Sequence, residues 1–286
     1  MTARASASNG AGAFVDLHAH STASDGSRAP RDVVREAKRL GLAAIALTDH
    51  DTLGGIEEAV AVGTEIGVRV VPGVELSAVE DDTETHILGL HVSNPRPIEA
   101  QLTALRAMRH SRAQRIVVRL NELGVRLEFS AVLEQAAGGA IGRPHVARAM
   151  IAEGWAVDLR DAFDRYLGSG RPAYVGKDRL ALSEAIDIIH AAGGLAILAH
   201  PGQSGTQERI AALAAHDLDG VEVRHPSHSS EDAARLLALV EHYSMVPSGG
   251  SDWHGAAEGP RTLGTMRVPA EWLSRQDERV RARATT

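Results

Sequence analysis

The sequence predicts an α/β protein in which a parallel sheet or barrel of alternating strands and helices carries an α-helical insertion. Short apolar runs alternate with amphipathic stretches over residues 13–92 and again over residues 183–247, as expected for strand–helix–strand units. Between these two regions, residues 98–167 have an almost entirely helical pattern. We therefore expect one parallel sheet or barrel whose chain is interrupted by a helical segment.

The first alternating region begins with a predicted strand at residues 13–17 and a predicted helix at residues 31–40. Pro30 stands near the start of this helix and Gly41 follows its end, and both residue types mark helix boundaries at these positions. The other elements expected here, in chain order, are a strand at residues 43–47, a helix at 56–66 and strands at 68–71 and 85–92.

The insertion begins with a long predicted helix at residues 98–123. Five arginines, each three or four residues after the previous one, lie largely along one face of this helix: Arg106, Arg109, Arg112, Arg115 and Arg119. The simpler interpretation is a solvated helix face, and the alternative is a basic rim for a phosphorylated substrate. After the insertion we expect helices at residues 183–192, 207–215 and 230–243 and strands at 195–199, 220–223 and 245–247.

The length of 286 residues fits one large domain or one domain with an insertion. We assign residues 13–95 and 180–268 to a discontinuous barrel and residues 96–179 to the helical insertion. The Ala/Ser/Gly-rich residues 1–12 and the charged residues 275–286 are predicted to be flexible termini.

The composition excludes several classes of protein. The chain has no cysteine, which rules out disulfide scaffolds, cysteine zinc sites, iron–sulfur clusters and thiol nucleophiles. A net charge of −7 gives no dominant basic surface for nucleic acid. No apolar run approaches the roughly 20 residues that cross a bilayer, and the first residues lack the apolar core of a signal peptide. We expect a cytoplasmic enzyme with no membrane contact and no obligate protein partner.

Histidine is abundant, with 14 residues, and many stand where a predicted strand ends. In parallel α/β folds these ends meet at one edge, where sites are built. His18 and His20 follow the first strand and point the same way in an extended segment. Seven successive strands end in or carry such groups, and the candidate metal ligands are His18, His20, His50, Glu75, His86, His200, Asp252 and His254.

This concentration of ionisable side chains predicts a metal site. Burying so many of them together costs several kcal/mol each unless they pair or bind metal. Imidazole and carboxylate without thiolate suit manganese, iron or zinc. Glu75 and Asp252 are the expected bridging carboxylates, and the number of ligands favours two or three divalent ions.

The same motifs resemble the PHP (polymerase and histidinol phosphatase) superfamily from residue 18 to about residue 255. The motifs are His-x-His, Thr-Asp-His-Asp, Gly-Val-Glu-Leu-Ser, Thr-His-Ile-Leu-Gly, Ala-His-Pro-Gly and Ser-Asp-Trp-His-Gly. The insertion with Gly-Arg-Pro-His and the later His-Pro-Ser-His are similar to the branch of nucleoside 3',5'-bisphosphate phosphatases and 5'-to-3' RNA-trimming enzymes. Asp25 also fits this branch. The resemblance implies a distorted (β/α)7 barrel.

The resemblance further implies three metals, the first of them between His18 and His20 and shared with Glu75 and Asp252. The ligands implied for the second are Glu75, His86 and His200, and those for the third are Asp25, His50 and His254. Asp16 and Asp49 are alternatives that would orient ligating imidazoles. Manganese is the expected metal, with iron or zinc as alternatives.

We predict hydrolysis of a nucleotide phosphate monoester by a metal-bridging hydroxide, most simply the 3'-phosphate of a nucleoside 3',5'-bisphosphate. Asp252 is the candidate catalytic residue that holds the nucleophile and manages its proton. The residues expected to bind the phosphates are Arg143, His145 and His225, with His228 undecided. The histidines outside any strand end are expected to be structural or exposed: His91, His110, His190, His216 and His242.

Four alternatives stay open. The first is a 5'-3' exoribonuclease on short 5'-phosphorylated RNA, although three Trp, three Tyr and three Phe make an extended stacking groove a poor expectation. The second is a histidinol-phosphate phosphatase, from which the Gly-Arg-Pro-His insertion points away. The others are a metal-binding module without catalysis and a metal-dependent amide or lactone hydrolase.

Overall fold

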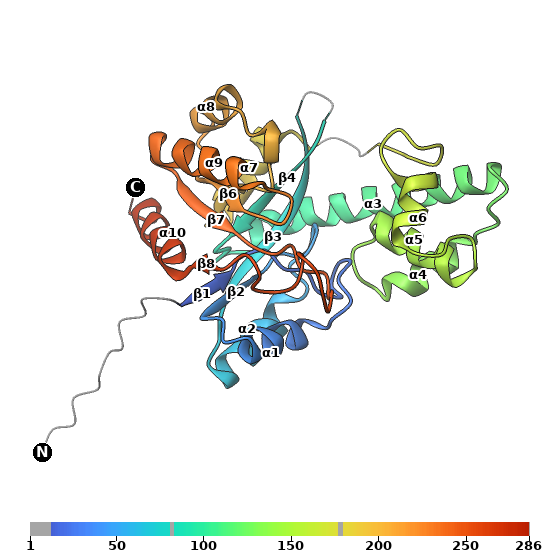
Figure 1. The fold of residues 1–286 in the computed structure, drawn as a ribbon, viewed down its shortest axis with the longest axis horizontal. Coiled ribbons are helices and arrows are strands. Elements are labelled where there is room, and N and C mark those ends of the chain that lie inside the picture. Colours follow the sequence, from blue (N-terminus) through green and yellow to red (C-terminus); the bar gives the residue numbers. More distant parts are fainter. Residues whose placement is uncertain (1–12, 81–82, 177–179, 286) are drawn as a thin grey trace, which may run out of the picture.

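The computed structural model describes residues 13–80, 83–176 and 180–285. Within them the chain forms an eight-stranded sheet in the order β7-β6-β5-β4-β3-β2-β1-β8, with helices around it and a helical lobe to one side (Figure 1). The backbone N–H of Leu17, just beyond β1, donates to the carbonyl of Gly249 at the end of β7. This contact brings β7 beside β1 and nearly closes the sheet into a barrel, which confirms the predicted fold class.

The strands are short except for β3 and β4, which have 12 and 8 residues. Their bounds are β1 Phe14–Asp16, β2 Ala44–Leu47, β3 Arg69–Glu80, β4 Thr83–Leu90, β5 Leu195–Leu198, β6 Gly220–Arg224, β7 Val246–Gly249 and β8 Val268–Pro269. β1, β2 and β3 are parallel neighbours, as are β5, β6 and β7. Apolar side chains such as those of Ile45 and Leu198 are completely buried between the sheet and its helices.

β3 and β4 differ from the sequence prediction. The strand expected to end at residue 71 continues to Glu80, so Glu75 lies inside β3 instead of beyond it. β4 runs antiparallel to both neighbours, and His86 pairs with Ser77 of β3. Because β4 is reversed, its first half lies at the edge where the parallel strands end. A residue near its start therefore meets the residues that follow the other strands.

Six helices of the described chain accompany the barrel strands. Their bounds are α1 Pro30–Arg39, α2 Ile56–Ile66, α7 Leu182–Ala191, α8 Gln207–Ala215, α9 Ser230–His242 and α10 Ala270–Arg283. Pro30 is the first residue of α1, and Gly41 follows the end of this helix with a left-handed φ of 71°, as the sequence signals predicted. α9 begins with a capping box between Ser229 and Asp232.

The chain end is helical where the sequence analysis predicted a flexible tail from Arg275. α10 buries Trp272, Leu273 and Gln276 and places Arg283 Nε 2.7 Å from the buried carboxylate of Asp219. The helix therefore continues through residues 275–283, where this apolar stripe and ion pair outweigh the high charge of the segment, and the flexibility of the tail stays a prediction. The predicted flexible leader, residues 1–12, lies outside the described residues.

The insertion has a hydrophobic core of its own. Its helices are α3 Arg96–Glu122, α4 Phe129–Ala136, α5 Arg143–Ala152 and α6 Leu159–Ala162, followed by a π-helical turn at Phe163–Leu167. The buried residues of this second core lie between Ala113 and Val175, whereas Ile98, Leu102 and Leu105 of α3 belong to the barrel core. We propose that the insertion is a unit within residues 96–179 and that α3 is shared by both cores.

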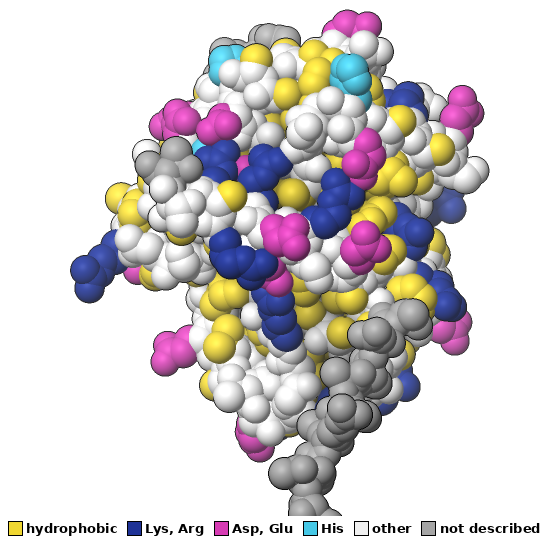
Figure 2. Space-filling model, turned by 90° about the vertical axis from the view of Figure 1, so that its left-hand side faces the viewer, with side chains coloured by type: hydrophobic (Ala, Val, Ile, Leu, Met, Phe, Trp, Pro, Cys, Tyr) yellow, Lys and Arg dark blue, Asp and Glu magenta, His cyan; other side chains and the backbone are white. Residues whose placement is uncertain are grey.

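The surface on the α10 side of the molecule carries mixed charge. In Figure 2 basic and acidic side chains are interspersed over this face instead of forming a patch of one sign. Ion pairs such as Arg69 with Asp277 and Arg275 with Glu241 are of this kind. Among the helices of the described residues, none combines the length and apolar character needed to cross a membrane.

Candidate metal centre

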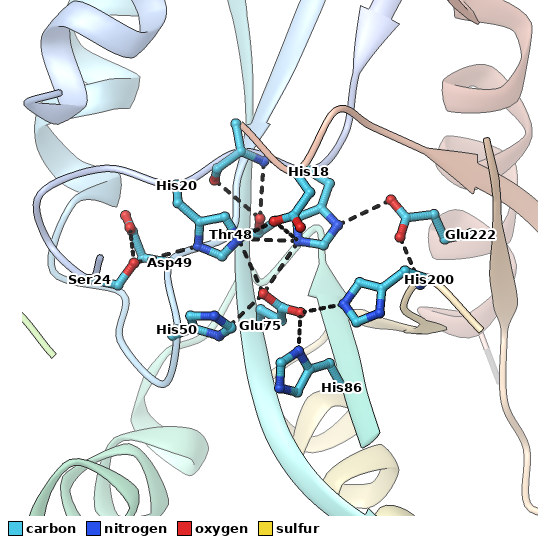
Figure 3. Close-up of polar contacts among 12 residues, drawn as sticks. His18, His20, Ser24, Thr48, Asp49, His50, Glu75, His86, His200 and Glu222 are labelled. Carbon is cyan, nitrogen blue, oxygen red and sulfur yellow. Dashed lines mark hydrogen bonds and ion pairs between the residues drawn. The ribbon is translucent and has the colours of Figure 1, made fainter. Parts of the chain in front are cut away.

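Nine side chains predicted as metal ligands meet at one end of the barrel, and we call them the ligand cluster. They come from the ends of β1, β2 and β5, from β3 and β4 and from the loops after β1 and β7. Figure 3 shows the members that surround Glu75. The members are His18, His20, Asp25, His50, Glu75, His86, His200, Asp252 and His254. Two of them, His200 and Asp252, have a positive φ, 30° and 50°, a conformation that is uncommon outside glycine and found at functional sites.

Glu75 is the centre of the cluster (Figure 3). Its Oε2 lies 3.3 Å from His18 Nε2, 3.1 Å from His20 Nε2 and 3.2 Å from His50 Nδ1. Its Oε1 lies 2.7 Å from His86 Nδ1 and 3.2 Å from His200 Nε2. One buried carboxylate thus faces five imidazoles, which suits a ligand that bridges metal ions.

The cluster divides into three groups whose ligand atoms lie within 4.8 Å of one another. The groups are His18, His20, Glu75 and Asp252; His20, Asp25, His50 and His254; and His50, Glu75 and His86. The first has the membership expected from the resemblance, and the second contains the expected third shell with His20 added. In the remaining group His50 stands where His200 was expected, although His200 also contacts Glu75.

The arrangement of ring nitrogens fits bound cations. His18 Nε2 and His20 Nε2 face each other at 3.2 Å, where a metal ion would use both lone pairs. His50 Nδ1 is buried without a hydrogen bond although it lies close to Glu75 Oε2. Imidazole and carboxylate ligands of this kind suit manganese, iron or zinc.

The electrostatics of the cluster are strongly coupled. Burial favours the neutral imidazole of His18, but Glu222 and Glu75 outweigh burial and raise its pKa to about 10. Burial favours the protonated form of Glu75, but His50, His86 and His18 hold the pKa of its carboxyl well below the usual range. The pKa of Asp25 is likewise held low against burial by His254 and His50. The carboxylates of Glu75 and Asp25 are therefore ionised and ready to bind cations.

Glu222 of β6 is a functional candidate that the sequence analysis missed. It is completely buried, its Oε1 lies 3.1 Å from His18 Nδ1, and its Oε2 accepts a hydrogen bond of 2.8 Å from the backbone N–H of His200. A carboxylate on the ring nitrogen opposite the metal fixes the orientation of a ligating imidazole. The available signal was a glutamate between two valines in a buried strand.

Asp16 and Asp49, considered as residues that orient imidazoles, instead organise backbone and hydroxyl groups. Asp16 accepts hydrogen bonds from the backbone N–H groups of Ser251 and Gly264. Asp49 accepts from Ser21 and from the hydroxyl of Ser24 at 2.6 Å. The Ser24 hydroxyl lies 3.5 Å from His20 Nδ1, so Asp49 reaches an imidazole only indirectly.

Arg143 and His145, both predicted to bind phosphate, have different environments at the start of α5. Arg143 lines a pocket beside the cluster, with its guanidinium carbon 5.5 Å from the ring centre of Tyr174. His145 is 1% exposed, and its Nδ1 accepts a hydrogen bond from Gly142 N–H. Burial lowers the pKa of His145 to about 4. It caps the helix, and the geometry gives no support to a phosphate contact.

His225 and His228 follow β6. His225 is 3% exposed and its Nε2 points to Asp252 Oδ2 at 3.5 Å, so the structure brings it to the edge of the cluster. His228 uses both ring nitrogens inside the protein, since Nδ1 donates to Val223 and Nε2 accepts from Gly202. This arrangement makes His228 a structural residue.

Two arginines of α3 differ from the prediction of a solvated helix face, whereas Arg115 and Arg119 are exposed as that prediction expects. Arg109 and Arg112 are 8% and 6% exposed, so neither belongs to a solvated face. Arg109 pairs with Asp51 and donates to Ser77, and Arg112 donates to the carbonyl of Val175. Arg106 also binds the carbonyl of Asp51. These side chains connect α3 to the segment beside His50 and to the insertion.

Comparison with known proteins agrees with this geometry. Residues 16–168 match the PHP domain. The chain belongs to the PHP domain family. It is 35% identical to the 5'-3' exoribonuclease Rnm of Escherichia coli over 84% of each chain. It is 34% identical to the 3',5'-nucleoside bisphosphate phosphatase of Chromobacterium violaceum over 88% of this chain and 91% of that protein.

A solved PHP-like structure has the same fold. It is that of a protein from Bifidobacterium adolescentis named for a metal-dependent phosphoesterase, with a TM-score of 0.87 and 32% identity over 93% of this chain and 96% of that one. Together with the ligand cluster, family and fold make this PHP protein a metal-dependent phosphoesterase, a hydrolase of phosphoric ester bonds.

Proposed function

We propose that this PHP protein hydrolyses a phosphate monoester of a nucleotide, the 3'-phosphate of a nucleoside 3',5'-bisphosphate. The observation that carries the proposal is a pocket of about 480 Å³ directly beside His86 and His200. Its volume lies in the range of roughly 300–1,000 Å³ that holds one small molecule, and Arg143 and Tyr174 line it. One nucleotide fits such a pocket better than an extended strand does.

The ligand cluster would hold two or three divalent ions, for which we propose manganese, with iron or zinc suited to the same ligands. Bound ions of this kind supply a nucleophile near neutral pH and neutralise charge on a phosphate. His18 and His20 would hold one ion with Asp252. Glu75 would connect it to the ion beside His86 and His200, and Asp25, His50 and His254 would hold another.

Asp252 is our candidate for the catalytic group. Its Oδ1 lies 3.2 Å from His20 Nε2 and 3.5 Å from His18 Nε2, inside the ligand cluster. In this position the carboxylate would orient the attacking water and accept its proton. Arg143 would bind the phosphate that is not cleaved, because a guanidinium forms bidentate hydrogen bonds with phosphate.

The test is a comparison of kcat/KM for the manganese-loaded protein on adenosine 3',5'-bisphosphate, 5'-phosphorylated short RNA and histidinol phosphate. We expect the bisphosphate to be the best substrate. His20→Ala and Asp252→Ala should each reduce its turnover at least roughly 100-fold, since losing a metal contact costs several kcal/mol of transition-state stabilisation. His242→Ala, at an exposed histidine of α9, is the matched control. If either site variant hydrolysed the bisphosphate at the wild-type rate with chelator present, the proposal would be refuted.

A 5'-3' exoribonuclease is the second candidate, favoured by the 35% identity to the Escherichia coli enzyme of that name. It would use the same ligand cluster. A higher kcat/KM on 5'-phosphorylated RNA than on the bisphosphate would establish it in place of the first candidate.

A further inference from the structure

Asp252 divides its two oxygens between two environments. Oδ1 faces the ring nitrogens of His18 and His20. Oδ2 faces the other way, toward His225 from the loop after β6 and Arg261 from the loop after β7. Nitrogen donors of His225 and Arg261 therefore lie beside the ligand cluster, on the side of Asp252 Oδ2.

Arg261 reaches this place from a glycine-rich loop. Its Nη1 pairs with Asp252 Oδ2, while 48% of its side chain stays exposed. In the part of the chain that the structure describes, no acceptor other than Asp252 binds its guanidinium. Because a guanidinium carries five N–H donors, most of them remain available to a ligand that enters from solvent.

His225 supplies a second donor at the same place. Its side chain is buried, and its Nε2 has no hydrogen-bond partner among the described residues. The other ring nitrogen, Nδ1, lies 2.7 Å from the hydroxyl of Ser227, which fixes the ring with Nε2 toward Asp252. A buried polar nitrogen without a partner is costly unless a ligand binds it.

We propose that Arg261, together with His225, binds the oxygens of the phosphoryl group that undergoes hydrolysis. The inference rests on the proposed phosphoesterase function and assigns a residue that motif analysis did not select. Arg261 lies on the Asp252 side of the cluster, and it does not line the pocket that contains Arg143. Its guanidinium can keep one N–H on Asp252 while others hold the phosphoryl oxygens, and so it would counter the charge that develops on them.

The test measures binding of inorganic phosphate by calorimetry at saturating manganese, beside the turnover of a simple phosphate monoester. Arg261→Gln should weaken phosphate binding roughly 10- to 100-fold, as expected for losing charge-assisted hydrogen bonds. Arg261→Lys should recover part of the phosphate affinity, since it restores the positive charge but not the planar set of N–H donors that binds phosphate bidentately. Arg267→Gln is the matched control, because it removes one charge from the same loop where the guanidinium stacks over Phe14.

A purely structural role for Arg261 would give a different result. If the residue only holds Asp252 in place, Arg261→Gln would weaken manganese binding and leave phosphate affinity unchanged at saturating metal, which would overturn the inference. Phosphate affinity that falls equally in the Arg267→Gln variant would also overturn it. Phosphate binding does not depend on nucleotide turnover. A wild-type protein that binds phosphate but hydrolyses no ester would therefore count against the proposed function alone.

Discussion

Glu222 is the residue whose role can be tested most directly without touching a metal ligand. It holds both the imidazole of His18 and the backbone of His200, and it is fully buried. We expect Glu222→Gln to reduce manganese affinity roughly 10- to 100-fold, because the amide cannot fix the His18 ring as a carboxylate does. Calorimetric titration of the metal-free protein would measure this loss.

Glu231→Gln is the control for that experiment, since it makes the same chemical change at an exposed position of α9. Its metal affinity should equal that of the wild type. Equal affinities in both variants would mean that Glu222 fills space without orienting His18.

At the scale of single residues, the sequence was informative where a side chain follows a strand. His18 and His200 could be placed together because parallel strands end at a common edge. Glu222 shows in the sequence only as a glutamate between two valines, which indicates burial but not its partners, because these follow the separate strands β1 and β5. Arg261 lies nine residues beyond Asp252 in a loop whose path no local pattern encodes.

At the scale of elements, α3 ties the insertion to the barrel through a buried ion pair. Arg109 of α3 and Asp51 are 8% and 1% exposed, and Asp51 also accepts a hydrogen bond from Ser77 N–H. Arg109→Met should destabilise the protein by roughly 3–5 kcal/mol, because it leaves the Asp51 charge buried without its partner. Urea unfolding at neutral pH would measure the change.

The control for this prediction is Arg160→Ala in α6, where 89% of the arginine side chain is exposed. It should leave the unfolding midpoint unchanged. A midpoint for Arg109→Met equal to that of the control would show that the buried pair contributes nothing to stability. Arg109→Lys keeps the positive charge but loses the paired N–H donors of the guanidinium. Its unfolding midpoint should fall between those of Arg109→Met and Arg160→Ala.

The elements that the sequence misplaced all depend on tertiary neighbours, which a local pattern of residues does not show. Spacing shows that the arginines of α3 recur on one face, but it does not show that Arg109 and Arg112 of this face are buried against Asp51 and Val175. In α10, Trp272 and Leu273 gave an apolar signal that the surrounding charges masked. For β4, alternating polarity is the same in a parallel and an antiparallel strand, so the reversal that brings His86 to the cluster could not be read locally.

At the scale of the whole molecule, the insertion contacts the loop that carries a metal ligand. The backbone N–H of Ala140 donates to Ala23 at 2.9 Å, and Arg148 Nη2 donates to the carbonyl of Asp25 at 2.6 Å. α3 adds a second connection, since it packs in both hydrophobic cores. Ordering of the Asp25 loop by a bound metal should therefore stabilise the insertion as well as the barrel.

The expected result is a single thermal transition that manganese shifts as a whole. A ligand at a hundredfold excess over its Kd adds about 2.7 kcal/mol to the free energy of unfolding, which raises Tm by roughly 5–10 °C for a chain of this size. Calorimetry with and without chelator would show the shift. Hydrogen exchange in α5 should slow on manganese binding together with exchange in the barrel strands.

Arg148→Met tests the connection itself, because it removes a contact to the Asp25 carbonyl and leaves every ligand of the cluster in place. In this variant manganese should still protect the barrel strands, while the protection gained by α5 should be smaller than in the wild type. Two separate transitions, of which manganese moves only one, would contradict the coupling. So would exchange in α5 that manganese leaves unchanged in the wild-type protein, since the insertion would then respond to nothing that happens at Asp25.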